Sequence, residues 1–180
     1  MRISYYKIFL LVIFLAFWIW AAISPLDRKT WLAENYLVFI FVPIIIIFAI
    51  YFKLSNTSYS LITFYIILHL IGSHYTYAQV PFGYVLQEFF NSSRNMYDRL
   101  VHFLFGLLLA YPFREIIIKI YKIKASLSYY FPILIIFSFA ALYEIIEWIA
   151  VEFFADPNTG IAFLGTQKDV WDTQKDMLLA

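Results

Sequence analysis

The sequence predicts an all-α, polytopic bundle of transmembrane helices. Of its 180 residues, 63% are hydrophobic and 14% are charged, whereas soluble domains are about 45–50% apolar and about 25% charged. The apolar residues gather in runs close to the roughly 20 residues that cross a bilayer core. With no cysteine and a formal net charge of +1, the chain excludes disulfides and thiolate metal sites and offers no basic surface for nucleic acid. We expect one transmembrane domain, residues 1–180.

Five apolar runs are long enough to be full spans. The first is expected to be a retained helix and not a cleaved signal peptide, because its AAIS end lacks a convincing small-x-small cleavage site. A polar stretch at residues 27–35 and a break at residues 53–58 bound the second run, and a basic loop separates the fourth from the fifth. The expected spans are residues 8–23, 36–52, 59–78, 97–118 and 127–151.

The last segment, residues 169–180, begins like a sixth helix. Its twelve residues measure about 18 Å at 1.5 Å per residue, against a hydrocarbon core of roughly 30 Å. The segment is therefore too short to span. Either it lies in the membrane interface or the chain stops partway through a sixth helix. The abrupt MLLA ending favours the second alternative, so we expect six helices in the intact protein.

Lysine and arginine in the loops predict the orientation of the bundle. The densest basic run is REIIIKIYKIK, residues 114–124, between the expected fourth and fifth spans. Because basic loops stay in the cytoplasm, this run and the basic residues before the first span predict a cytoplasmic N-terminus.

Ionisable residues at the ends of the spans are costly in a membrane and call for an explanation. Under alternating topology, the end of an outgoing span and the start of the next span lie on the same side of the membrane. Four groups of such residues therefore converge on the outer leaflet. They are His69 and His74 at the end of the third span, Asp98 and His102 at the start of the fourth, Glu144 and Glu147 late in the fifth, and Asp169, Asp172 and Asp176 in the last segment.

The spacing within these groups places each on one helix face. Asp98 and His102 are four residues apart, and Glu144 and Glu147 are three apart, so each pair shares a face. The three aspartates of the last segment also gather on one side of their helix. The two histidines are five residues apart, which is about 140° on a helix, so His74 reaches the site only if the third helix ends near Gly72.

Carboxylates and imidazoles without sulfur suit a hard or borderline divalent cation such as Zn, Mn, Fe or Mg. Helical bundles build such sites from inward-facing residues on several helices. A cation there would polarise a phosphate or ester group, or activate water, which predicts a metal-dependent membrane hydrolase acting on a lipid or lipid-linked head group. The expected metal ligands are His69, Asp98, His102, Asp169, Asp172 and Asp176, the expected catalytic residues are Glu144 and Glu147, and the expected substrate-binding residues are Arg94, Arg99, Lys175 and His74.

Simpler interpretations exist for part of this set. Asp98 beside Arg99, and Asp176 beside Lys175, also fit local charges at a helix start, where acids complement the helix dipole. That interpretation does not explain Glu144, which lies at the wrong end of its helix. Two alternatives to an enzyme stay open: a proton-coupled transporter that uses the acids and histidines as a relay, and a non-catalytic scaffold whose polar cluster fixes helix packing.

Four ordered motifs resemble a known family. They are HYTYAQVPFG, RNMYDRLVHF, YEIIEW and FLGTQKDVWDTQKDM, and they cover the chain from the third span to the last segment. The sequence is similar in these motifs to the YjdF-like family of bacterial inner-membrane proteins, whose function is unknown. The resemblance implies a multi-pass protein of about six helices in the bacterial inner membrane. The Asp-x-x-x-His pair and the later acids are also similar to VanZ-like membrane proteins, linked to glycopeptide resistance, over these few residues alone.

Overall fold

The computed structural model describes residues 4–124, 126–154 and 166–180. Within these ranges the chain is helical and has no strand, which confirms the predicted all-α class. The long helices are α1 (Tyr5–Ala22), α2 (Arg28–Tyr51), α3 (Asn56–Tyr75), α5 (Tyr97–Lys119) and α6 (Tyr130–Phe154). A 3₁₀ turn at Leu127–Tyr129 precedes α6. The short helices are α4 (Pro81–Phe89) and α8 (Asp172–Leu179).

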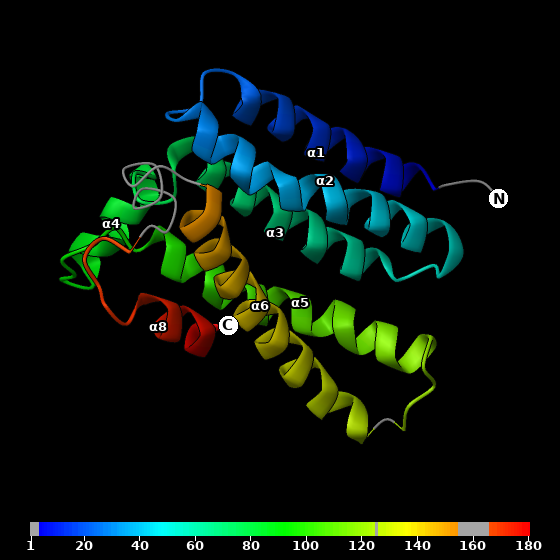
Figure 1. Ribbon diagram of the computed structural model, residues 1–180. Coiled ribbons are helices and arrows are strands. Elements are labelled where there is room, and N and C mark those ends of the chain that lie inside the picture. The colour runs from blue at the N-terminus through cyan, green and yellow to red at the C-terminus, as the bar shows by residue number, and fades with distance from the viewer. Residues whose placement is uncertain (1–3, 125, 155–165) are drawn as a thin grey trace.

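The centre of the bundle is α3, which packs against α1 and against α5. Figure 1 shows α1, α2 and α3 running side by side, with α5 and α6 beyond them and α4 and α8 near one end. The helix α6 packs on α5, and α8 lies against both α5 and α6. This arrangement brings the end of α3, the start of α5, the end of α6 and the segment of α8 to the same end of the molecule (Figure 1).

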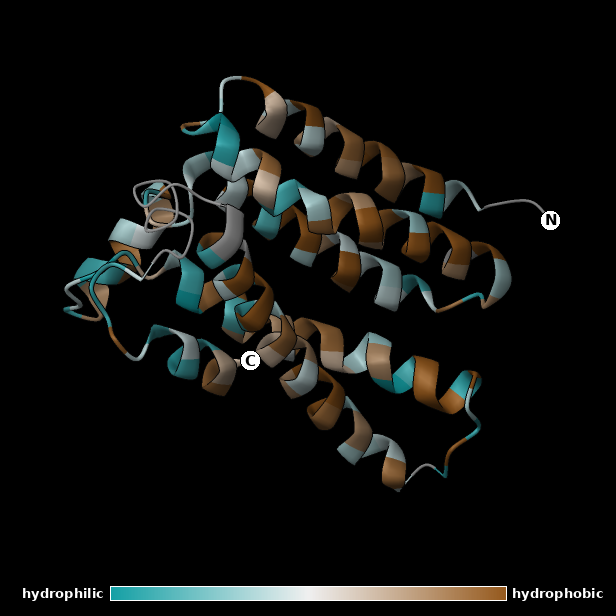
Figure 2. Cartoon of the chain, viewed as in Figure 1, coloured by the Kyte–Doolittle hydropathy of each residue, from teal (hydrophilic) through white to brown (hydrophobic). Residues whose placement is uncertain are grey.

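Four helical segments of the described chain are long and apolar enough to cross a membrane. Hydrophobic residues predominate along them, as the brown bands in Figure 2 show, and many of their large apolar side chains are exposed. The predicted third span, α3, is long enough but has polar side chains near both ends and is not among the four. The four segments are Tyr5–Ala22, Arg28–Phe48, Tyr97–Lys119 and Leu127–Ile149.

The second long helix begins earlier than the hydropathy of the sequence predicts. Residues 27–35 were expected to lie before the span, but α2 starts at Arg28. The Asp27 carboxylate caps the helix by accepting hydrogen bonds from the backbone amides of Lys29 and Thr30, at 3.0 and 3.4 Å. Since an N-cap aspartate satisfies amides that the first turn leaves without partners, the polar stretch becomes two further turns of helix. Glu34 consequently lies inside α2.

The last segment does form a helix, α8, of eight residues. Its final turn approaches α5 so closely at Gly106 that an added Cβ atom would collide with the backbone oxygen of Ala180. A glycine permits this close backbone approach because it has no side chain. The expected sixth span stays a prediction.

Candidate functional site

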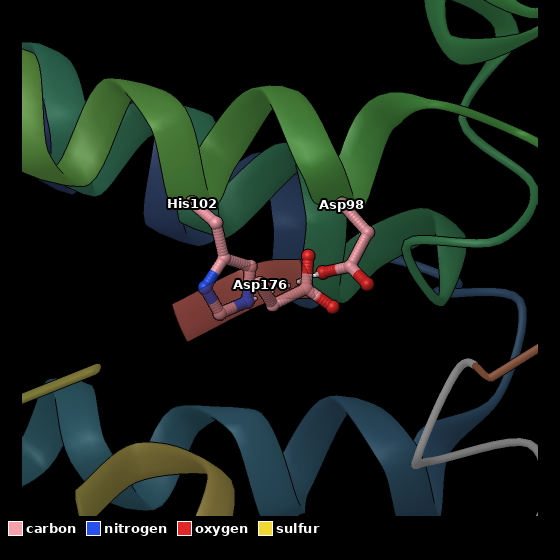
Figure 3. Close-up of side chains that lie close together, drawn as sticks. All are labelled: Asp98, His102 and Asp176. Carbon is pink, nitrogen blue, oxygen red and sulfur yellow. Dashed lines mark ion pairs between the residues drawn. The ribbon is translucent and has the colours of Figure 1, made fainter. Parts of the chain in front are cut away.

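Three predicted metal ligands converge at the end of the bundle. Asp98 and His102 project from one face of α5 toward Asp176, which comes from α8 (Figure 3). Each of the three residues offers one ligand atom, and these atoms all lie within 4.8 Å of one another. His102 Nε2 lies 3.6 Å from Asp98 Oδ1. We call these three residues the acid–histidine site.

Glu144 reaches the same imidazole from α6. Its Oε1 atom lies 3.6 Å from His102 Nε2, the same distance as the Asp98 oxygen. Both separations exceed the roughly 2.7–3.2 Å of a protein hydrogen bond. His102 therefore faces two carboxylates and lies beyond hydrogen-bond distance of both.

The buried acid of α8 lacks a full set of partners. Asp176 is 2% exposed, and its Oδ1 atom has no hydrogen-bond partner, although Arg99 Nη1 lies 2.6 Å away as an ion pair without hydrogen-bond geometry. A carboxylate in this state favours an additional cation, because an ion would neutralise charge that is costly to bury.

Two buried arginines bind the aspartates of the last segment. Asp172 bridges them, since its Oδ1 accepts hydrogen bonds from Arg94 Nη1 and from Arg99 Nη2, the latter at 2.7 Å. Arg99 also donates to the Asp172 backbone oxygen at 2.9 Å and to Asp169 Oδ2 at 3.1 Å. Arg94 contacts Asp98 at 3.3 Å. The arginines therefore fasten the start of α8 to α5, and Asp172 is engaged by guanidinium groups.

The outer acid of the segment is engaged in a different way. Lys175 Nζ lies 2.7 Å from Asp169 Oδ2, not beside Asp176 as its place in the sequence suggests. Asp169 accepts this hydrogen bond and one from the Trp171 amide, and together they lower the pKa of the Asp169 carboxyl. Burial raises the pKa of Asp172, which Arg94 partly opposes.

His69 is buried beside the site but already has two partners. Its Nε2 is 3.2 Å from the backbone oxygen of Glu34, which can only accept, and its Nδ1 is 2.6 Å from the Tyr77 hydroxyl. The proton therefore sits on Nε2, and Nδ1 accepts from the tyrosine. Neither nitrogen has a lone pair left for a metal, so the structure does not bring His69 into the acid–histidine site.

His74 lies on the other side of α3. The helix continues to Tyr75 instead of ending near Gly72, so the imidazole turns toward α1. It stacks on Trp20 with ring centroids 4.5 Å apart, and its Nδ1 is 3.1 Å from the Ala21 oxygen. The structure thus places this expected substrate-binding residue away from the others.

Comparison with known proteins agrees with the resemblance noted in the sequence. The family described as "Predicted membrane protein (DUF2238)" matches residues 6–180. The chain belongs to this family. One relative, the inner membrane protein YjdF of Escherichia coli strain K12, is 39% identical over 163 residues, which cover 90% of this chain and 77% of the relative. No solved structure matches the chain. These matches confirm the YjdF-like assignment, and they do not show the similarity to VanZ-like proteins.

The motifs that carry the family resemblance meet around the site. Gly83, in the first motif, leaves room for the Asn95 side chain, because an added Cβ atom would collide with Asn95 Oδ1. Asn95 donates to the Val80 backbone oxygen at 2.9 Å, and its backbone amide donates to Gln167 Oε1 at 2.8 Å. This network joins segments that are far apart in the chain and positions the start of α5, from which Asp98 and His102 project.

The sequence analysis missed a further buried acid, Glu34 of α2. It is 3% exposed and accepts a hydrogen bond of 3.1 Å from the Tyr143 hydroxyl of α6. Its charge interacts with that of Glu147, which is half-buried. The available signal was the spacing of Glu34 four residues after Thr30 and four before Val38, both of which are buried in α2. The structure therefore separates the two predicted catalytic acids: Glu144 faces His102, and Glu147 faces the Glu34 side.

Proposed function

We propose that the protein is a metal-dependent membrane hydrolase whose acid–histidine site acts on a lipid or lipid-linked head group. The observation that carries this proposal is the convergence of Asp98, His102 and Asp176, with ligand atoms within 4.8 Å of one another. Zn, Mn, Fe and Mg accept carboxylate and imidazole ligands at about 2.0–2.2 Å. Small side-chain adjustments would close the three residues around such an ion.

Charge balance supports a cation at this position. The acids gathered here are Asp98, Glu144, Asp169, Asp172 and Asp176, and the fixed cations in contact with them are Arg94, Arg99 and Lys175. Five negative charges against three positive charges leave two uncompensated, which a divalent ion would offset. Zn, Mn, Fe and Mg all meet this requirement, and the donor set does not select among them.

Glu144 is the proposed general base. A bound cation would polarise the phosphoryl or acyl oxygen of the substrate. Glu144 would accept a proton from the attacking water, the water oxygen would form a bond to phosphorus or to the acyl carbon, and the ester bond to the leaving alcohol would break. The alcohol would then leave with a proton. Arg94, Arg99 and Lys175 are proposed to attract an anionic head group and to hold α8 in place.

The membrane placement that goes with this proposal has α3 as a fifth span and a sixth span beginning in α8. The N-terminus would be cytoplasmic in the bacterial inner membrane, and the site would face the outer leaflet. The name of the Escherichia coli relative supports the inner-membrane location. A cysteine-accessibility experiment at Ser93 and at Lys122, on opposite ends of α5, tests the orientation directly.

The decisive experiment measures metal in purified protein. We expect a stoichiometric divalent metal in the wild type and its loss in Asp98→Ala and His102→Ala. Glu115→Gln is the matched control, because it changes a buried carboxylate at the opposite end of α5. Retention of the metal in both site variants would refute the proposal.

The same variants distinguish the other two function classes. A proton-coupled transporter predicts proton flux in liposomes that disappears with Glu147→Gln, with no metal present. A scaffold predicts a changed melting temperature and no change in any activity. The face of α5 that lines the cavity beyond His102 is apolar, with Phe105, Leu109 and Phe113. This face offers a transporter no charged path.

A further inference from the structure

A large cavity lies inside the bundle beside the acid–histidine site. Its volume is about 400 Å³, and side chains of α2, α3, α5 and α6 line it. Pockets that bind small molecules commonly measure about 300–1,000 Å³. Asp98 and His102 line the cavity themselves, so it is continuous with the site.

The lining changes character along α5. At the site end the cavity is bounded by polar groups, among them Asp98, His102 and the Tyr143 hydroxyl. Further along the same helix face the lining residues are Phe105, Leu109 and Ile116. The eighteen helical steps from Asp98 to Ile116 cover about 27 Å at 1.5 Å per residue, nearly the thickness of a hydrocarbon core. The cavity therefore has a polar end at the site and an apolar end further along α5.

Two of the lining helices, α2 and α6, are not among the helix pairs that pack closely in the described part of the chain. α2 packs on α3 and α6 packs on α5, but α2 and α6 diverge away from the site end, as Figure 1 shows. Near the site they are joined by the Tyr143–Glu34 hydrogen bond, and further along by an edge contact of Phe41 with Phe139, with ring centroids 6.4 Å apart. Because α2 and α6 are both long and apolar enough to cross a membrane, the side of the cavity between them would face lipid.

We infer that this cavity binds one hydrocarbon chain of a lipid phosphate, with the chain along α5 and the phosphate at the acid–histidine site. The inference rests on the proposed function and names its substrate class. An apolar void loses dispersion contacts along its whole lining, and water does not fill such a space, so a lipid chain is the occupant that matches it. A phosphate head suits a site with arginines and a divalent cation.

The test uses alkyl phosphates that carry a photoreactive diazirine at the far end of the chain. The full protein is reconstituted in nanodiscs, crosslinked and analysed by peptide mass spectrometry. We expect the hexadecyl probe to label Phe113 or Ile116, at the far end of the cavity, and the octyl probe to label near Phe105. A neutral hexadecanol probe should label this region less than the phosphate does.

A pair of adjacent alanines on α6 provides the matched variants. Ala140 lines the cavity and is buried, whereas Ala141 does not line it. Ala140→Phe should reduce far-end labelling by the hexadecyl probe about tenfold, since the phenyl ring would fill space that the chain needs, and Ala141→Phe should leave it unchanged. If Ala140→Phe fails to fold, Phe113→Ala, which enlarges the cavity, should move the label deeper.

The outcomes separate this inference from the proposed function. Far-end labelling without bound metal would support the chain-binding cavity and contradict the proposed metal-dependent hydrolase. Bound metal with hexadecyl labels only on outward-facing residues, indifferent to Ala140→Phe, would overturn the cavity and leave the metal site intact.

Discussion

Buried carboxylates lie at both ends of α5, and they differ in how completely they are bonded. At the loop end, Glu115 accepts hydrogen bonds from the Ser55 amide and hydroxyl at 2.8 Å each, and from the Ser58 hydroxyl. Lys119 Nζ adds an ion pair at 2.5 Å. At the site end, Asp176 Oδ1 has an ion pair with Arg99 at 2.6 Å but no hydrogen-bond partner. We call the first group the Glu115 cluster.

The difference indicates what each group does. A buried carboxylate whose oxygens are all bonded holds its neighbours together, and its loss leaves donors without partners. The Glu115 cluster therefore fixes the start of α3 to α5. The acid–histidine site keeps donor atoms near one another without closing them on each other, which costs stability and is typical of a place that binds a ligand.

The largest loss of stability is expected from substituting Arg99, whose positive charge pairs with the aspartates beside the site. Arg99→Met would leave Asp169, Asp172 and Asp176 without the guanidinium that contacts all three. Removing one partner of a buried ion pair costs about 3–5 kcal/mol. Thermal unfolding in detergent measures the change, and Arg99→Lys should recover part of it. A melting temperature equal to that of the wild type would mean that the arginine is not holding α8 on α5.

The Glu115 cluster should show the next largest effect. Glu115→Gln keeps the shape of the side chain but loses the charge that accepts from two serines and pairs with Lys119. We expect a loss of about 1–3 kcal/mol, the range for hydrogen bonds to charged groups. Metal content should not change. A stability loss accompanied by loss of metal would show that the two ends of α5 are coupled and that the Glu115 cluster is not purely structural.

A substitution in the acid–histidine site should affect metal binding strongly and stability little, the reverse of Glu115→Gln. Asp176→Asn removes a charge that is paired with Arg99 but has no hydrogen bond at Oδ1, and Arg99 keeps Asp169 and Asp172, so no buried charge loses its last partner. We expect stability within about 1 kcal/mol of the wild type, together with at least a tenfold loss of metal affinity by titration, because one ligand is gone. Destabilisation as large as that of Glu115→Gln would place Asp176 with the structural carboxylates.

The sequence predicts the long helices and the end of the bundle where the acids gather, because hydropathy and spacing report them directly. It does not predict Glu34 as an interior residue, since the Asp27 cap turns a polar stretch into helix. The separation of His69 from His74 depends on where α3 ends, which spacing alone left open. The partners of Arg94 and Lys175 were out of reach as well, because they depend on how α8 docks on α5.

Asp27 tests whether the role of a carboxylate follows from its position in the bundle or from how completely it is hydrogen-bonded. It lies at the site end, where the neighbouring Leu26 amide donates to the His74 backbone oxygen at 3.0 Å, yet its carboxylate is fully engaged as the cap of α2. Its hydrogen bonds, led by the one from the Thr30 hydroxyl, lower its pKa.

If bonding and not position decides the role, Asp27→Ala should reduce stability by about 1 kcal/mol at neutral pH, the usual value of an N-cap, and leave metal content unchanged. Because the folded-state pKa is depressed, the contribution is present above the unfolded-state pKa of about 3.9 and is lost as pH falls through the lower folded value. The difference in melting temperature between wild type and variant should therefore hold from neutral pH to about pH 5 and shrink below about pH 4. A difference that stays constant into strong acid would show that the carboxylate charge contributes nothing to the cap.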